Sequence, residues 1–316
     1  MQDSLPRWWG TFWNKLKLNL TKGNDNMSNQ ITTAFVQQYS SNVQMLSQQM
    51  GSYLRGAVDV ESVVGKNAFF DQVGKTTAVL RTSRHSDTPQ VDTPHSRRRV
   101  SLADYEWADL IDNADKVRLL IDPTSSYAKA AASAMGRAMD DVIIAALGGT
   151  SFTGETGSTS VTLPAAQKPF SASQTDGLTI AKLLSAKKIL DLADVDPSIQ
   201  RYIVCGPKQI SDLLGTTQVT SADFNTVKAL AQGQLDSFLG FKFIVSNRLV
   251  FDATNTDDRL CYAFTADAIK LAVGQDVLAR IDERADKSYS TQVYYAMSIG
   301  ATRMEEEKVV QIACDE

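Results

Sequence analysis

The side chains best suited to chemistry in this chain are few, and they lie mainly in one polar stretch. The sequence has only two histidines, His85 and His95, and both fall there. A catalytic triad needs a histidine held rigidly toward its nucleophile. Metal ligation by this pair would need Asp87 or Asp92 to converge on the same point. A polar stretch without a rigid frame offers neither, so we predict no catalytic residue, no metal site and no cofactor, and we expect a protein that is not an enzyme.

Motifs for nucleotide or hydrolytic chemistry do not change this expectation. The glycine-rich run from Gly148 to Gly157 follows an expected helix instead of opening one, and it lacks the lysine of a phosphate-binding loop. The chain contains no G-x-G-x-x-G, H-E-x-x-H or G-x-S-x-G motif. Neighbouring carboxylates occur at Asp140–Asp141, Asp257–Asp258 and Glu305–Glu307. Nothing in the sequence marks them as shielded from water, so we interpret them as solvated surface.

The three cysteines, Cys205, Cys261 and Cys314, are far apart, and none forms a C-x-x-C pair. An odd, sparse set of this kind fits neither a disulfide framework nor a zinc site. We predict buried free thiols in strands, in a chain that folds in a reducing compartment.

The strongest electrostatic feature is a cluster of arginines in the same polar stretch. Between residues 81 and 99, five arginines face two aspartates, a net charge of +3 in a chain whose net charge is −4: Arg81, Arg84, Arg97, Arg98 and Arg99 against Asp87 and Asp92. Arginine suits bidentate pairing with carboxylates and phosphates. The interpretations are a contact with acidic patches on a neighbouring subunit, which we favour, a DNA contact, or a solvated surface. The acidic overall balance disfavours a protein that coats DNA.

These arginines belong to a predicted hairpin. Residues 76–82 and 98–107 have the composition of strands. The segment between them is polar and interrupted by Pro89 and Pro94. A hairpin over 76–110 without an apolar tip has little core of its own, so we expect it to project.

A long helix should follow the hairpin. Asp122 and Pro123 give a capping residue and a favoured first helical position, and Gly148 and Gly149 end the pattern. Apolar residues recur between them at helical spacing: Tyr127, Ala131, Ala134, Met135, Ala138, Val142, Ile143 and Ala146. The prediction is a helix over 123–147, about 25 residues and roughly 37 Å long.

Upstream, a narrow apolar stripe predicts a helical arm that docks on another surface. Its residues recur at spacings of four and three: Phe35, Tyr39, Val43, Leu46 and Met50. Residues 1–26 carry Trp8, Trp9, Phe12 and Trp13, and Met27 opens a stretch that reads like a natural start. We favour an upstream extension or cleaved leader for 1–26; a segment lying on a membrane surface is the alternative.

Downstream, the pattern alternates between helices and strands, which indicates a layered α/β or α+β domain. A loop is expected over 150–178, helices over 179–193, 207–214 and near 223–231, and strands over 202–205 and 241–246. The last sixty residues are strand-rich, over 260–265, 268–273, 277–283, 289–299 and 308–314.

This order of parts resembles the major capsid proteins of tailed bacteriophages, which have the HK97-like fold. The segments that carry the resemblance are Asp122–Gly149, Gly240–Leu249 and Gly300–Met304 leading to Val309–Ile312. It implies, after the uncertain extension 1–26, an N-arm over 27–75, an E-loop over 76–110 and a P-domain part over 111–177 that includes the spine helix 123–147. An A-domain over 178–250 and further A- and P-domain strands over 251–316 complete it.

The resemblance also implies a role. The chain would self-assemble into an icosahedral shell of hexamers and pentamers around double-stranded DNA. Its partners would be scaffolding and portal proteins and a possible decoration protein, with no membrane partner. The chain would reside in the virion after assembly in the host bacterial cytoplasm. Some family members crosslink covalently through an E-loop lysine, but residues 81–99 contain none and the nearest is Lys75.

Three alternatives stay open at this point: an encapsulin-like compartment of the same fold, a soluble α/β enzyme, and a DNA- or membrane-binding protein. Within the capsid interpretation, we hypothesise that Arg97, Arg98 and Arg99 lock the hairpin onto a neighbouring subunit. Replacing all three with alanine should then leave the subunit folded but impair assembly.

Overall fold

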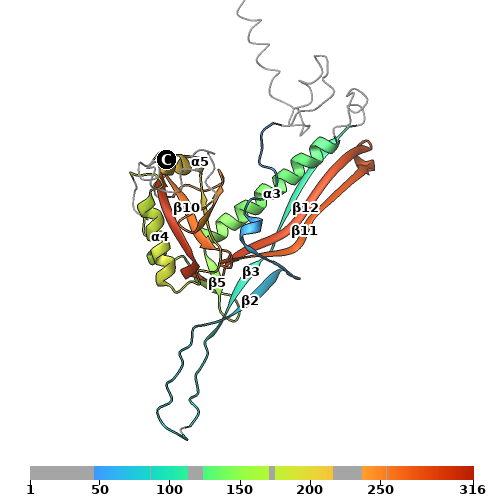
Figure 1. Cartoon of the computed structure of the whole chain (residues 1–316). Coiled ribbons are helices and arrows are strands. Elements are labelled where there is room, and N and C mark those ends of the chain that lie inside the picture. Colours follow the sequence, from blue (N-terminus) through green and yellow to red (C-terminus); the bar gives the residue numbers. More distant parts are fainter. Residues whose placement is uncertain (1–45, 86, 113–123, 171–174, 216–236, 254) are drawn as a thin grey trace, which may run out of the picture. The chain divides into compact units, whose positions relative to one another are not determined.

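The computed structural model describes residues 46–85, 87–112, 124–170, 175–215, 237–253 and 255–316 (Figure 1). The predicted arm residues Phe35, Tyr39 and Val43, the Asp122–Pro123 cap and the helix near 223–231 lie outside these ranges. No helix among the described residues is long and apolar enough to cross a membrane.

The first sheet has four strands and carries the long helix. Its order is β1 (Asp59–Ser62), β11 (Ile269–Arg284), β12 (Ser290–Arg303) and β4 (Ala103–Ile111), with β1 parallel to β11 and the other pairs antiparallel. Helix α3 (Thr124–Gly148) packs along β12 and β4 (Figure 1). The long-helix prediction is confirmed. The strands predicted over 268–273 and 277–283 are one strand, β11, because bulges near Gln275 bend it without ending it.

The second sheet has five strands in the order β13 (Val309–Asp315), β10 (Asp258–Thr265), β7 (Arg201–Cys205), β9 (Phe241–Val245) and β8 (Ser237–Phe238). Helix α4 (Ile180–Leu192) packs against β13, and α5 (Pro207–Gly215) follows β7. Thr179 caps α4 as its side chain accepts from the Lys182 N–H. The predicted strands and helices of this region are confirmed where the structure describes them.

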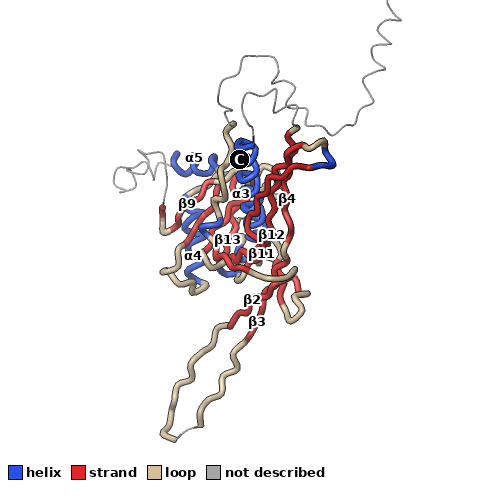
Figure 2. The backbone as a smooth tube through the Cα atoms, turned by 90° about the vertical axis from the view of Figure 1, so that its right-hand side faces the viewer, coloured by secondary structure: helices blue, strands red, loops and turns tan. Residues whose placement is uncertain are grey.

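The third sheet holds the hairpin, and here two predictions are wrong. Its order is β2 (Asn67–Val73), β3 (His95–Ser101), β5 (Ser151–Thr153) and β6 (Thr159–Val161). Figure 2 shows β2 and β3 side by side at the base of the hairpin. The strand predicted over 98–107 is two strands, β3 in this sheet and β4 in the first sheet. Residues 76–82 form no strand, and the chain pairs nine residues earlier, through β2. The reason is burial: Phe70 of β2 enters a small apolar cluster with Val100 and Met304, whereas Val79 and Leu80 have no apolar surface to cover.

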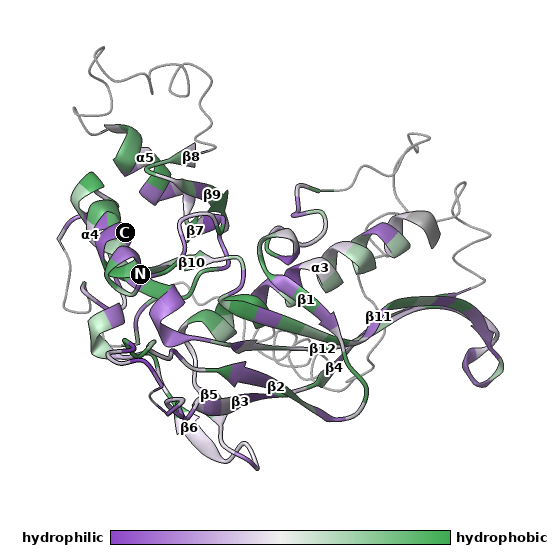
Figure 3. Ribbon diagram, turned by 60° about the horizontal axis from the view of Figure 1, so that its bottom comes forward, coloured by the Kyte–Doolittle hydropathy of each residue, from purple (hydrophilic) through white to green (hydrophobic). Residues whose placement is uncertain are grey.

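The described residues also form four short 3-10 helices: η2 (Arg55–Ala57), η3 (Ala165–Gln167), η4 (Ala285–Lys287) and η5 (Glu306–Lys308). One continuous core joins α3 and the first sheet to α4 and the second sheet. Strand β3 is mostly hydrophilic, in contrast to the region where β12 meets α3 (Figure 3). The hairpin therefore depends on a few contacts at its base.

Candidate intersubunit surfaces

The segment 74–94 between β2 and β3 is called here the extended loop. It extends from the end of the hairpin and has no regular secondary structure among its described residues (Figure 1). Its side chains are exposed: Leu80 retains 84% of its accessible surface and Val79 59%. Arg81 and Arg84 are exposed too, and the Arg81 Nε–H donates to the Ser83 carbonyl at 3.0 Å. The loop therefore presents apolar and cationic side chains that the subunit itself does not cover.

The three consecutive arginines of β3 behave differently from the hypothesis. Arg98 is buried, donates from Nε to the Met304 carbonyl at 2.9 Å and pairs with Glu306 at 2.7 Å. Arg97 pairs with Asp71 at 3.0 Å and lies over the Phe69 ring. An alanine triple replacement would remove these contacts within the subunit, which argues against the expectation that it leaves the subunit intact.

Arg99 is half-buried and stacks on another element of the same sheet. Its guanidinium carbon lies 4.9 Å from the centre of the Phe152 ring of β5. Of the five arginines in the predicted contact, Arg81 and Arg84 are thus the two whose guanidinium groups have neither a carboxylate nor an aromatic partner among the described residues.

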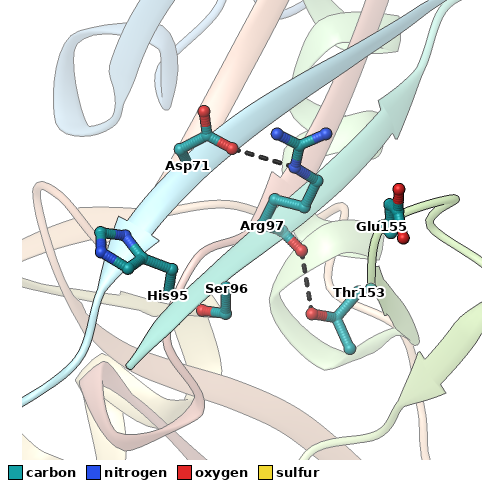
Figure 4. Close-up of a pocket in the computed structure, with 7 residues that line it drawn as sticks. Asp71, His95, Ser96, Arg97, Thr153 and Glu155 are labelled. Atoms are coloured by element: carbon teal, nitrogen blue, oxygen red, sulfur yellow. Dashed lines mark hydrogen bonds and ion pairs between the residues drawn. The ribbon is translucent and has the colours of Figure 1, made fainter. Parts of the chain in front are cut away.

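An open pocket of about 630 Å³ lies at the base of the loop (Figure 4). Its walls come from β2, β3 and the β5–β6 turn: Asp71, His95, Ser96, Arg97, Thr153, Gly154 and Glu155. The Thr153 hydroxyl donates to the Arg97 carbonyl at 2.9 Å. In the described parts of the chain, no three histidine, cysteine or acidic side chains are placed to hold a metal ion. The pocket is a polar recess whose Arg97 already has a partner.

The chain entering the fold is held to α3 by one buried carboxylate. Asp140 is fully buried and accepts four hydrogen bonds, from the Gln49 amide, the Ser52 hydroxyl and the backbone N–H groups of Tyr53 and Leu54. The prediction of a solvated Asp140–Asp141 pair is therefore wrong.

The remaining contacts of α3 at this point confirm a close fit. Gly136 lets the segment approach, because a Cβ there would lie 2.3 Å from the Gly51 carbonyl carbon. Asp141, one residue after Asp140, pairs with Arg248 from the loop after β9. Helix α3 thus contacts residues 49–54 through Asp140 and the loop after β9 of the second sheet through Asp141.

The predicted helical stripe also needs correction at its described end. Residues 46–50 form no helix, and Leu46 and Met50 retain 89% and 70% of their surfaces. The polar contacts of Gln48 and Gln49 with α3 carry the attachment instead: Arg137 donates to the Gln48 side chain at 3.1 Å. Docking through Phe35, Tyr39 and Val43 falls outside the described residues.

In the acidic run Glu305–Glu307, the prediction of solvated surface is confirmed for Glu305 and Glu307, which are exposed, and is wrong for Glu306, which is half-buried. Glu306 meets Arg98, Glu307 lies 3.3 Å from Lys75, and Glu305 lies 3.4 Å from Lys308. Lys75 lies at the start of the extended loop, and its Nζ also donates to the Ala193 carbonyl at 3.0 Å.

A buried arginine that the sequence gave no reason to single out completes this region. Arg303 has no exposed surface and donates to the Leu147 and Gly149 carbonyls at 2.9 Å each, at the C-terminal end of α3. Those carbonyls lack helical partners and carry the negative end of the helix dipole, which a cation stabilises. Burial lowers the pKa of Arg303, and Glu306 partly opposes that effect.

The three cysteines are buried free thiols, as predicted, and they gather in the second sheet on β7, β10 and β13. Burial, and next the neighbouring Cys314, raises the pKa of Cys205 to about 12. A hydrogen bond with Cys314 and burial raise the pKa of Cys261 well above its usual value. At neutral pH such groups are thiols and poor nucleophiles.

Comparison with known proteins identifies a family that this chain matches. A family model described as phage capsid protein matches residues 31–316. A search of the curated proteins gives no match.

Among solved structures, the capsid of Ralstonia phage GP4 aligns with a TM-score of 0.69 at 13% identity, covering 89% of this chain and 95% of that one. The capsid of cyanophage P-SCSP1u aligns at 0.67 and 15% identity over 98% of both chains. A protein of Mycobacterium phage Che8 aligns at 0.64 and 19% identity, covering 88% and 97%. The chain therefore shares its fold with phage capsid subunits.

Proposed function

The chain belongs to the phage capsid protein family, and from this premise we propose how the subunit builds its shell. As a major capsid protein it forms the structural wall of the phage head. The proposal is that the extended loop reaches from one subunit onto a second copy, within hexamers and pentamers of an icosahedral shell that encloses double-stranded DNA. Scaffolding, portal and decoration proteins would be its partners, assembly would occur in the host cytoplasm, and the chain would have no catalytic role.

The observation that carries this proposal is the exposure of the loop. Ordering one residue costs roughly 1–2 kcal/mol in backbone entropy, and a loop that leaves Val79 and Leu80 in solvent recovers little of that cost within the subunit. A second copy that covers these side chains would supply the missing burial. In these terms we assign the E-loop to the hairpin with its loop, the spine helix to α3, the P-domain to the first sheet and the A-domain to the second.

Electron microscopy of negatively stained protein tests the shell, with the purified chain alone and together with its scaffolding product. A compact monomer of this length has a radius of gyration of only about 20 Å. We expect closed particles far larger than that. Their contents separate a phage head from an encapsulin-like compartment, because one encloses DNA and the other a protein cargo. A persistent monomer with scaffold present would contradict the proposal.

A charge-matched pair of variants tests the loop. Arg81→Ala with Arg84→Ala removes two exposed cations from the loop. Lys187→Ala with Lys188→Ala removes the same charge from α4, at one half-buried and one exposed position. We expect both proteins to fold and the loop variant alone to lose closed shells. Equal shell yields from the two variants would contradict a contact through the loop arginines.

A further inference from the structure

The five residues Met304–Lys308 lie where the chain crosses from the first sheet to the second. They lead from β12 of the first sheet to β13 of the second. The opposite crossing, between β10 and β11, lies beside them: the Met304 N–H donates to the Ala268 carbonyl at 2.8 Å, and Lys308 Nζ donates to Asp267 at 2.6 Å. We call this segment the junction.

The junction also holds the first root of the extended loop, at the end of β2. The Gln72 amide donates to the Met304 carbonyl at 2.7 Å. Three residues later, Lys75 pairs with Glu307 and donates to the Ala193 carbonyl beyond α4. The first root is therefore tied to the junction and to the second sheet's helix.

The second root, on β3, is tied more tightly. Arg98 is buried and uses Nε for the Met304 carbonyl and Nη2 for Glu306. The other Glu306 oxygen lies 3.7 Å from Nε of Arg303, whose guanidinium binds the end of α3. Glu306 thus stands between two buried arginines, and its removal would leave both without their carboxylate.

We propose that the junction is a positioning device that fixes the direction in which the extended loop leaves the subunit, with Glu306 as its central contact. The loop has no packing of its own, so its direction depends on its roots. The first root is bound to Met304 and Glu307, and the second root is bound to Met304 and Glu306. A direction set within the subunit lowers the ordering cost at assembly, because the loop meets its partner already aligned. Only this last step, from direction to assembly, rests on the proposed function.

Distances between two spin labels, measured by pulsed electron paramagnetic resonance, test whether the junction fixes the direction of the extended loop. One label is placed on the loop at Thr82→Cys and one on α4 at Lys188→Cys, both exposed positions. The native cysteines are buried, so they stay unlabelled in the folded protein. Labelled chain is diluted into an excess of unlabelled chain, which keeps the measured pairs within one subunit.

The comparison uses two neighbouring glutamates. Glu306→Gln should broaden the distance distribution and reduce the yield of closed shells. Glu305→Gln is the matched control, since Glu305 contacts Lys308 and touches neither root, and it should leave both readouts unchanged. A Glu306→Gln distribution as narrow as that of the unmodified protein would overturn the proposal.

A variant of the first root covers the case in which Glu306→Gln fails to fold. Gln72→Ala with Glu307→Gln removes the side-chain contacts of that root and leaves Arg98 and Glu306 in place. Broadening in this variant supports the device, and an unchanged distribution overturns it. If the unmodified chain itself gave no shells, the proposed function would fail, and the distances would still decide whether the junction sets the loop.

Discussion

Two segments of this subunit are held in opposite ways. The segment 48–54 lies along α3 and delivers four hydrogen bonds to the buried Asp140. The extended loop 74–94 is bound at its roots, and Val79 and Leu80 stay in solvent. The first segment is completed by its own subunit. The second segment leaves its side chains exposed, and we expect a neighbouring subunit to bury them on assembly.

The difference also shows which surfaces can change independently of the fold. A substitution in the segment on α3 affects a buried polar site, where unpaired groups are costly. A substitution in the loop affects a surface that the isolated subunit exposes. The free energy of unfolding of the subunit, measured by chemical denaturation, tests this contrast.

Asp140→Ala should have the largest effect. It leaves four donors without their acceptor in a buried site, and we expect a loss of about 3 kcal/mol. Asp257→Ala, at an exposed position, is the control and should change stability by less than about 0.5 kcal/mol. If Asp140→Ala were as mild as its control, the segment would not be held by this carboxylate.

Gly136→Ala should have a smaller but clear effect. Alanine favours a helix over glycine by about 1 kcal/mol, but its Cβ would meet the backbone of Gly51. Such overpacking costs about 1–3 kcal/mol, so we expect a net loss. Gly56→Ala is the control, because a Cβ at Gly56 meets no atom within 4 Å. A gain in stability for Gly136→Ala would show that the segment can move away from α3.

Acid should weaken the junction that holds the loop. Burial alone would raise the pKa of Asp267, but hydrogen bonds from Lys308 and Thr265 outweigh it, so its pKa lies below the usual value. The stabilisation is therefore full above pH of about 4 and is lost as pH falls through the lowered pKa.

The check is Asp267→Asn, measured at pH 6 and pH 3. Because Asp267 is partly exposed, we expect the variant to be less stable at pH 6 by less than about 1 kcal/mol. The difference in free energy of unfolding between the variant and the unmodified protein should be smaller at pH 3. A difference that grew in acid would contradict the ion pair.

The smallest effect on the subunit is expected in the loop. Val79→Ser with Leu80→Ser removes exposed apolar side chains, so the free energy of unfolding should change by less than about 0.5 kcal/mol. The yield of closed shells should nevertheless fall. A large loss of subunit stability would show that the loop is packed within its own chain, and would break the contrast with the segment on α3.

The sequence predicted the regular elements well where local signals agreed with burial. The helical spacing of Ala131, Met135 and Ile143 predicted α3, and all three are buried in it. The prediction failed for residues 76–82, which have the composition of a strand but pair with no other strand. Strand β3 pairs with β2 instead, where Phe70 is buried. Strand composition describes a side chain's fitness for a half-buried surface, and only tertiary packing decides whether that surface exists.

The sequence by itself determined the order of the elements, the long helix, the buried thiols and the resemblance to phage capsid proteins, because these depend on periodicity and on the types of neighbouring residues. Only the tertiary structure decided which charges are internal. Asp140 meets Ser52 across 88 positions of sequence, and Arg98 meets Glu306 across 208. A carboxylate or a guanidinium looks the same in sequence whether water or a distant partner satisfies it, and the cost of burying it is repaid only by the geometry of that partner.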